Sequence, residues 1–341
     1  MSPEAPPTAP SLERVQAQAR TLADRVISGD RAALSEALNQ VDDSRVEHKE
    51  RGLCLLDALA PHSKGLRIGV TGAPGAGKST LLDALVSALR EQDRSVGVLA
   101  VDPSSQRTGG ALLGDRMRLG SSARDAGVFL RSLAARDQLG GLSAVTGPSL
   151  DVLSSAVDCV FVETVGVGQS ESQVIDLVDT LVFVAQPAAG DLLQFMKAGI
   201  LEWPDIFFVN KADLGDIATR SAAELRAGLD LSQQRDPDHL PPVLCGSARD
   251  GLGLEALIEA IDQHARHLSH TNLGETRRRV GRLARVQRAL TARYGAYGLD
   301  RLARSHALEE RVVKRASVSV DRVIDELSRV IEKDLRSGDG S

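Results

Sequence analysis

The chain has 341 residues, of which 42% are hydrophobic and 3% aromatic, and its 41 basic and 46 acidic residues give a net charge of −5. A chain of this length can bury a full core, but it has few aromatic rings on which nucleic-acid bases could stack. The excess of acidic residues argues against a surface that binds a nucleic-acid duplex. The composition therefore favours a soluble enzyme without a nucleic-acid partner.

The first 62 residues carry no strand pattern. Residues 1–10 are rich in proline and lack both a basic start and an apolar segment, which predicts a disordered tail and not a signal peptide. Residues 11–62 place apolar side chains such as Leu22 and Val26 at helical spacing, so we expect two or three helices there. No run approaches the roughly 18 apolar residues of a membrane span, and the three cysteines are scattered. We expect a cytoplasmic protein without a membrane partner.

A glycine-rich segment follows the apolar run at 66–70 and matches the phosphate-binding pattern G-x-x-x-x-G-K-[ST]. Its glycines leave backbone N–H groups free to approach phosphate oxygens, and a helix starting near Gly77 adds its positive end. Lys78 is expected to reach the β- and γ-phosphates, and the Ser79 hydroxyl to bind Mg²⁺. The expected nucleotide-binding residues of this loop are Gly72, Ala73, Pro74, Gly75, Ala76, Gly77, Lys78, Ser79 and Thr80.

From this first strand onward, short β-branched runs alternate with helical stretches. This alternation predicts an α/β fold with a mostly parallel sheet and helices on both of its faces. Further strands are expected at residues 95–101, 128–131, 158–162, 180–185, 205–209 and 243–245.

Carboxylates at the ends of two expected strands indicate a magnesium site. Glu163 ends an apolar strand and opens the pattern E-x-x-G, in which the Gly166 N–H could sense the γ-phosphate. Asp102 ends the expected strand at 95–101, and Asp115 lies on a glycine-rich loop. Each acid alone could be a helix cap or a solvated charge. Three of them around one phosphate loop favour Mg²⁺-assisted hydrolysis of a nucleoside triphosphate.

The segment Asn210-Lys211-Ala212-Asp213 directly follows an expected strand and predicts selection of guanine. The Asp213 carboxylate can accept hydrogen bonds from the guanine N1–H and 2-amino group, which adenine does not present in this arrangement. Asn210 can tie this segment to the phosphate loop, and the Lys211 stem can lie over the base. A backbone N–H in a later turn is expected to meet the guanine O6; that turn comprises Ser247, Ala248 and Arg249. GTP and GDP are therefore the expected ligands.

The strands stop after about residue 275, and two long, charged, periodic helices are expected at 276–305 and 308–336. The second carries an apolar stripe that includes Val320 and Leu327 and needs a partner surface, either the core or a second copy of the chain. We expect a homodimer.

Three histidines recur at every third position near the end of the helix before these two. His264, His267 and His270 are the nearest approach to a histidine cluster in the chain. Their spacing favours a surface stripe over a metal site.

Three further segments carry a family resemblance. They are Val-Asp-Pro-Ser-Ser at 101–105, Gly-Gly-Ala-Leu-Leu-Gly-Asp-Arg-Met-Arg at 109–118 and Glu-Thr-Val-Gly-Val-Gly-Gln-Ser-Glu at 163–171. With the motifs above, they resemble the MeaB/ArgK family of P-loop GTPases, whose human member is the methylmalonic aciduria type A protein. The resemblance implies a homodimeric chaperone of an adenosylcobalamin-dependent acyl-CoA mutase. In that family GTP binding and hydrolysis gate cofactor loading and protect or reactivate the mutase.

The resemblance also assigns roles to residues and boundaries to segments. It implies Mg²⁺ ligation by Ser79, Asp102, Asp115 and Glu163, catalysis by Lys78, Glu163 and Gly166, and a partner-responsive switch containing Asp191, Gln194 and Lys197. Together with the patterns described above, it divides the chain into a tail at 1–10, an N-terminal helical segment at 11–62, a P-loop GTPase domain at 63–270 and a C-terminal helical dimerisation arm at 271–341. Residues 129–136 look more like the GTPase domain fused within isobutyryl-CoA mutase, so the partner mutase stays open.

Two other functions stay open beside this one. A metal-insertion GTPase for nickel or zinc enzymes predicts a histidine-rich tail or a cysteine cluster, and neither stands in the sequence. A kinase associated with amino-acid transport requires a phosphoryl acceptor site with a base beside the γ-phosphate. No glutamine or base that could orient water stands next to Gly166 in sequence, so intrinsic hydrolysis is expected to be slow.

Overall fold

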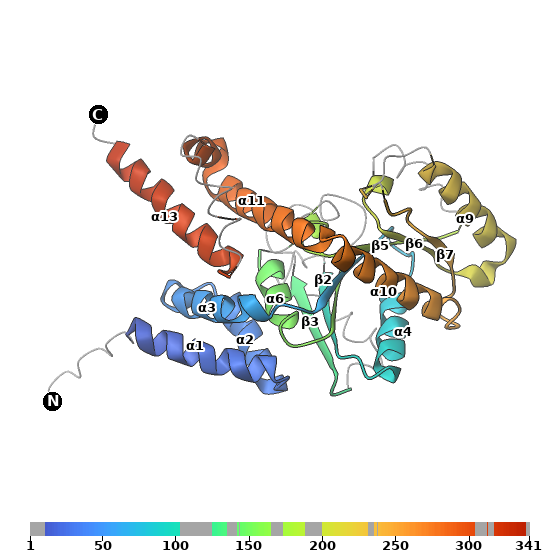
Figure 1. The fold of residues 1–341 in the computed structure, drawn as a ribbon, viewed down its shortest axis with the longest axis horizontal. Coiled ribbons are helices and arrows are strands. Elements are labelled where there is room, and N and C mark those ends of the chain that lie inside the picture. Colours follow the sequence, from blue (N-terminus) through green and yellow to red (C-terminus); the bar gives the residue numbers. More distant parts are fainter. Residues whose placement is uncertain are drawn as a thin grey trace, which may run out of the picture.

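The computed structural model describes residues 11–102, 125–134, 142, 144–164, 173–187, 200–230, 235–236, 238–303, 312 and 317–338. Within these ranges the chain forms a seven-stranded parallel sheet in the order β3-β2-β4-β1-β5-β6-β7, which confirms the predicted α/β fold (Figure 1). The strands are β1 Leu66–Thr71, β2 Val96–Asp102, β3 Val128–Ala134, β4 Cys159–Glu163, β5 Thr180–Ala185, β6 Ile206–Val209 and β7 Val243–Cys245. The strand expected at 128–131 is three residues longer, because its last residues pair with the end of β2.

Both faces of the sheet are covered, which explains the almost continuous apolar strands. On one face Val160 and Val162 of β4 belong to the core that includes the N-terminal helices. Phe161, between them, points to the other face and packs in the core shared with α4 and α10. The helices around the sheet are α4 Lys78–Glu91, α6 Thr146–Leu153, α9 Asp216–Leu229 and α10 Leu254–His270, with short 3-10 turns η1 Ala60–His62, η3 Ile200–Glu202 and η4 Ala212–Leu214.

The N-terminal segment forms three helices, in agreement with the predicted two or three. They are α1 Leu12–Ile27, α2 Arg31–Asp42 and α3 Val46–Leu59. Asp30 caps α2, because its carboxylate accepts hydrogen bonds from the backbone N–H groups of Ala32 and Ala33. Arg31, the first residue of α2, donates to the carbonyl oxygens of Asp125 and Val128 and so joins the N-terminal helices to the outer strand β3.

The C-terminal arm consists of α11 Leu273–Ala303 and α13 Val320–Gly338. The expected helix at 276–305 is broken at Gly295, whose φ of 62° and ψ of −157° are not helical. The expected helix at 308–336 is also not continuous, because residues 317–319 are non-helical. The apolar stripe of α13 packs on α11 of the same chain, where Val323 and Leu327 share a buried cluster with Val286. The stripe thus finds a partner within one chain.

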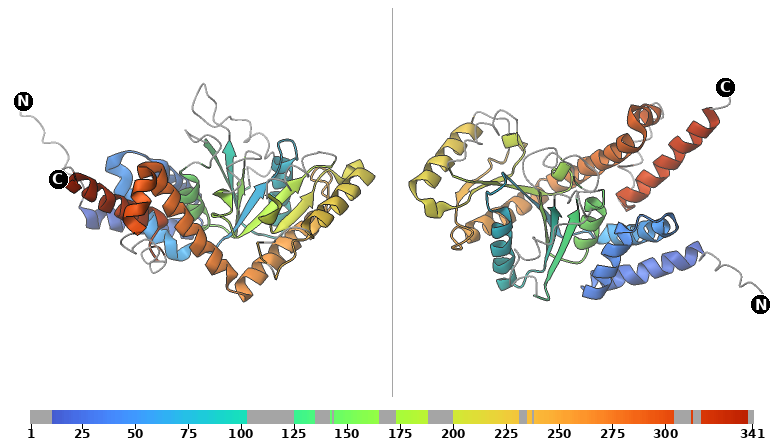
Figure 2. Two further views of the ribbon diagram at one scale, coloured as in Figure 1. Left: turned by 90° about the horizontal axis from the view of Figure 1, so that it is seen from above. Right: turned by 180° about the vertical axis from the view of Figure 1, so that it is seen from behind.

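The arm also contacts the N-terminal helices. Asp57 of α3 accepts hydrogen bonds from the Ser319 N–H at 3.0 Å, from its hydroxyl at 2.7 Å and from Arg322 Nε at 2.8 Å, and so holds the start of α13. As a result α13 and the N-terminal helices lie together at one end of the molecule, and α9 lies at the other (Figures 1 and 2).

Candidate functional site

The phosphate-binding pattern forms a tight loop between the central strand β1 and the start of α4. Gly72, Gly75 and Gly77 have φ values of 140°, 80° and 88°, a region that residues with a β-carbon rarely adopt. A β-carbon at Gly72 would lie 2.1 Å from the Val184 carbonyl oxygen, and one at Gly77 would lie 2.5 Å from Asn210 Nδ2. The loop can therefore pass close to its neighbours only with glycine at these positions. Helix α4 begins at Lys78 and directs its positive N-terminal end at the loop.

Lys78 is buried and turned back over this loop. Its ammonium group donates to the carbonyl oxygens of Gly72, at 2.8 Å, and Ala73, at 3.2 Å. The loop thus holds a positive charge beside its own backbone N–H groups, which is the arrangement that suits a polyphosphate.

Two oxygen ligands for a hard cation meet next to Lys78. The Ser79 hydroxyl donates a 2.7 Å hydrogen bond to Glu163 Oε1, and Glu163 is half-buried at the end of β4. Asp102 ends the neighbouring strand β2, two residues beyond Ala100, which pairs with Glu163 in the parallel register. Hydroxyl and carboxylate oxygens are the ligands that Mg²⁺ prefers, so these residues fit the expected metal. Asp115 and Gly166 lie outside the described residues.

Asn210 joins the loops that follow three different strands. Its side-chain amide donates to the Ala76 carbonyl oxygen at 2.8 Å, and its Oδ1 accepts from the Ala248 N–H at 2.9 Å. The predicted tie between Asn210 and the phosphate loop is therefore confirmed. Lys211 follows in a left-handed conformation with φ of 60°, and its ammonium donates to the Gly75 carbonyl oxygen at 2.8 Å. The loops after β1, β6 and β7 form one connected unit.

The Asp213 carboxylate lies at the outer side of this unit. Its Oδ1 is 3.1 Å from the Ser247 hydroxyl, and its Oδ2 is 3.3 Å from the Arg249 guanidinium. Ser247 Oγ also lies 2.8 Å from Asp250 Oδ2, so its single proton can serve either acid. Asp213 and Ser247–Arg249, which the sequence motifs placed in one guanine site, thus lie side by side.

Part of the predicted site lies outside the residues that the structure describes. Asp191, Gln194 and Lys197 of the expected switch are not among the described residues, and for Asp102 only the backbone is described. One site residue was missed from the sequence: Gln186, directly after β5, accepts a 3.0 Å hydrogen bond from the Lys211 ammonium. The only signal for it was a polar residue between a buried strand and a proline.

The predicted histidine stripe is wrong for its first member. His264 is fully buried, and its Nδ1 lies 2.8 Å from the Thr180 hydroxyl, while His270 is exposed. The ring of His239, from a separate loop, has its centroid 4.8 Å from that of His264. Burial lowers the pKa of His264 to about 4. Among the described residues no group of three or more histidine, cysteine or acidic side chains could hold a metal ion.

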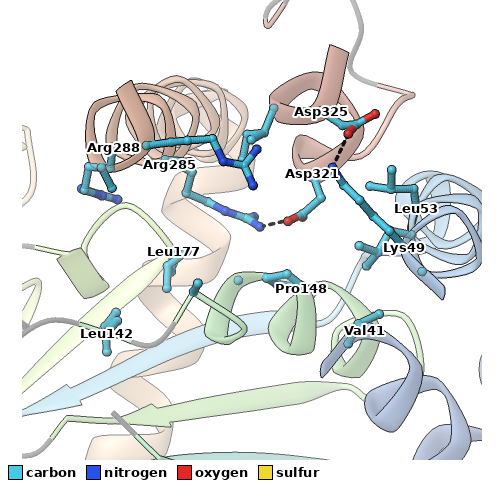
Figure 3. A pocket seen from close by; sticks show the side chains of 18 of the residues that line it. Val41, Lys49, Leu53, Leu142, Pro148, Leu177, Arg285, Arg288, Asp321 and Asp325 are labelled. Carbon is cyan, nitrogen blue, oxygen red and sulfur yellow. Dashed lines mark hydrogen bonds and ion pairs between the residues drawn. The ribbon is translucent and has the colours of Figure 1, made fainter. Parts of the chain in front are cut away.

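A cavity of about 620 Å³ lies away from the nucleotide loops, between the N-terminal helices, α6 and the arm. Figure 3 shows Arg285 pointing toward Asp321 and Lys49 toward Asp325 in its wall. None of the predicted site residues lines this cavity. We interpret this cavity as the space where the C-terminal arm meets the N-terminal helices and α6.

The fold, the phosphate loop and the guanine motif define the class of this protein: it is a P-loop GTPase. The chain belongs to the MeaB family, because the family's sequence model, described as Methylmalonyl Co-A mutase-associated GTPase MeaB, matches residues 34–295. Among the described residues, no helix is long and apolar enough to cross a membrane.

Known proteins with similar sequences support this assignment. GTPase ArgK of Escherichia coli is 38% identical over 242 residues, which cover 70% of this chain and 73% of that protein. The mitochondrial methylmalonic aciduria type A homolog of Mus musculus is 38% identical over 244 residues, covering 67% of this chain and 59% of that protein. A solved structure of a LAO/AO transport system kinase superposes with a TM-score of 0.66 and 26% identity, covering 93% of this chain and 98% of the other.

Proposed function

We propose that this chain is a Mg²⁺-dependent GTPase chaperone of an adenosylcobalamin-dependent acyl-CoA mutase, working as a homodimer in the cytoplasm. Its cycle of GTP binding and hydrolysis would gate cofactor loading and protect or reactivate the mutase. The family description, which names a mutase-associated GTPase, supports the partner class. The observation that carries the nucleotide site is the pair of hydrogen bonds through which Asn210 joins the phosphate loop to both guanine loops.

The proposed roles follow from chemistry at each end of the nucleotide. Ser79, Asp102 and Glu163, with Asp115, would hold Mg²⁺. When bound, this ion neutralises charge on the β- and γ-phosphate oxygens. Lys78 adds a positive charge on the same phosphates and stabilises the charge that leaves with GDP. Asp213 accepts hydrogen bonds from the guanine edge, which adenine cannot supply. Gly166 would sense the γ-phosphate through its N–H group.

We infer that residues 63–270 form the hydrolytic domain and that the segments on either side serve contacts with other chains. On α13 the side chains of Val330 and Leu335 remain 39% and 42% exposed, although they lie at helical spacing from the buried residues Val323 and Ile331. Exposed apolar residues on an otherwise docked helix support a dimer contact through the arm. Sedimentation of the purified chain should then give twice the monomer mass.

The partner can be tested directly with methylmalonyl-CoA mutase and isobutyryl-CoA mutase. Each is passed over the immobilised GTPase loaded with GDP or with a non-hydrolysable GTP analogue, and the GTP hydrolysis rate is measured with each mutase added. We expect one mutase to be retained and to change the rate, which is slow for the GTPase alone. Retention of neither mutase in either nucleotide state, with an unchanged rate, would remove the chaperone proposal.

The two other functions predict different results. A metal-insertion GTPase would bind Ni²⁺ or Zn²⁺ in equilibrium dialysis. A transport-associated kinase would transfer label from γ-labelled GTP to a candidate binding protein. We expect neither, and label released only as inorganic phosphate.

A further inference from the structure

Gln186 occupies a special position among the loops of the nucleotide site. Strand β5 lies between β1, which leads to the phosphate loop, and β6, which leads to the guanine motif, and it pairs with both. Gln186 is the first residue after β5, so it leaves the sheet between the two loops. The backbone here is fixed, because the Asn210 N–H donates to the Ala185 carbonyl oxygen at 2.9 Å and Pro187, which is buried, restricts the residue before it to extended conformations.

The side chain of Gln186 contacts the lysine that spans the two loops. Lys211 Nζ donates at 2.8 Å to the Gly75 carbonyl oxygen and at 3.0 Å to Gln186 Oε1. Gln186 Oε1 also lies beside the phosphate loop, 3.9 Å from the position that a β-carbon on Gly75 would take. Gln186 is half-buried, so its amide is shielded in part from water. The ammonium of Lys211 is therefore held from two sides, by the phosphate loop and by the end of β5.

We propose that Gln186 is a positioning residue that fixes Lys211 across the edge of the base site and thereby slows release of the guanine nucleotide. A lysine side chain loses much rotational freedom when it is ordered, and this loss opposes binding if it occurs only when the nucleotide arrives. With Gln186 in place, the stem of Lys211 is ordered before the base binds. The inference rests on the nucleotide site proposed above and adds a residue that the sequence motifs do not contain.

The chemistry of an amide suits this position. Its carbonyl oxygen accepts from the ammonium without adding a negative charge beside a loop that binds polyphosphate. A glutamate could make the same contact, but its charge would repel the phosphates. Gln186 contacts Lys211 of the guanine motif, whereas Ser79 and Glu163 meet where Mg²⁺ is expected to bind. Loss of Gln186 should therefore change nucleotide retention and leave the hydrolytic step at saturation nearly unchanged.

The test uses the full chain with Gln186→Leu, which keeps the size of the side chain and removes the acceptor. We expect GDP carrying a fluorescent label on its ribose to dissociate about tenfold faster, KM for GTP to rise by a similar factor, and kcat to stay within about twofold. The unfolding temperature of the nucleotide-free protein should not change. A lower kcat with unchanged dissociation would overturn the proposal, as would parent behaviour in all assays.

A double-mutant cycle shows whether Gln186 acts through Lys211. In a Lys211→Met background, Gln186→Leu should change the GDP dissociation rate by less than about twofold, since the ammonium is no longer present to be held. Independent, multiplicative effects would contradict the proposal. If Gln186→Leu fails to fold, Gln186→Asn, whose amide is one methylene shorter, replaces it with the same expectations.

Failure of this inference can be told apart from failure of the site itself. If Lys78→Ala and Asp213→Asn leave GDP binding unchanged, the nucleotide site is misassigned. If those variants lose binding but Gln186→Leu does not, only the role of Gln186 is wrong.

Discussion

The hydroxyl of Ser79 donates a 2.7 Å hydrogen bond to the carboxylate of Glu163, which lies 84 residues further along the chain. The bond joins the first turn of α4 to the end of β4. Both oxygens come from elements anchored in the sheet, so they are ordered before a metal binds. We expect preorganised oxygen ligands of this kind to bind Mg²⁺ without first ordering a loop.

Glu163→Gln should separate the structural and electrostatic roles of this residue. The glutamine oxygen can still accept from Ser79, so the fold should survive, but the charge that attracts Mg²⁺ is lost. We expect the Mg²⁺ concentration for half-maximal GTP hydrolysis to rise about tenfold or more, with kcat reduced, while GDP binding without Mg²⁺ changes little. Glu202→Gln, at an exposed position, is the matched control. An unchanged Mg²⁺ dependence would exclude Glu163 from the metal site.

Lys78→Ala should abolish measurable hydrolysis. The substitution removes the buried ammonium that the phosphate loop holds through Gly72 and Ala73. Loss of one charge that stabilises a transition state typically reduces a rate by about a hundredfold or more, and affinity for GTP should fall more than affinity for GDP. Phosphate release measures the first effect and equilibrium titration the second. Lys64→Ala, on the exposed surface, should behave like the parent. Unchanged turnover would contradict the assignment of the phosphate loop.

Asp213→Asn should weaken the preference for guanine and favour xanthine instead. Guanine offers two donors to the carboxylate of Asp213. Xanthine has a carbonyl oxygen in place of the 2-amino group, and this oxygen can accept a hydrogen bond from the amide of asparagine. We expect GTP affinity to fall by about 1 to 3 kcal/mol and affinity for xanthosine triphosphate to rise. Competition binding measures both. Asp216→Asn, three residues on and exposed, is the control. Equal GTP affinity in Asp213→Asn and the parent would remove the argument for base recognition.

The sequence was most informative about features that depend on residues close together in the chain. Parallel strands buried on both faces, such as Thr180–Ala185, read as apolar runs, so their places were predicted closely. The phosphate loop and the guanine motif were predictable because each needs fixed residue types at fixed spacing. Gln186 had no such pattern. Its role depends on β5 lying between β1 and β6, which is a property of the sheet order.

The contact that holds the start of α13 was unpredictable for a similar reason. Residues 317–319 interrupt an otherwise periodic stretch because Asp57, on a helix near the other end of the chain, accepts from Ser319 and Arg322. Ser319 also caps α13 locally, because its hydroxyl accepts from the Arg322 N–H at 3.2 Å, but no local pattern indicates the contact with Asp57, 262 residues away. His264 was misassigned likewise, since its burial comes from packing against the start of β5.

Asp57→Ala should loosen the arm without affecting the nucleotide site. Three hydrogen bonds to the start of α13 are lost, and one of them leaves the Ser319 N–H without its partner. Such losses typically cost about 1 to 3 kcal/mol. We expect faster proteolysis within the arm and a lower unfolding temperature, with GDP affinity unchanged. Asp24→Ala, exposed on α1, should change neither property. Parent-like protection of the arm would show that Asp57 does not hold it.

His264 should make the protein less stable in mild acid. Burial lowers its pKa to about 4, with Arg277, His239 and His267 acting in the same direction and Asp205 opposing them. In the unfolded chain His264 takes up a proton near the ordinary histidine pKa of 6.5, so the stabilisation is complete above that pH and is lost as pH falls toward 4. The free energy of unfolding, measured by urea denaturation, should fall between pH 7.5 and pH 5 in both the parent and His264→Gln. The fall should be smaller by about 2 kcal/mol in His264→Gln. His270 is exposed, so His270→Gln should keep the pH dependence of the parent. If the free energy of unfolding falls equally in His264→Gln and the parent, groups other than His264 cause the loss of stability.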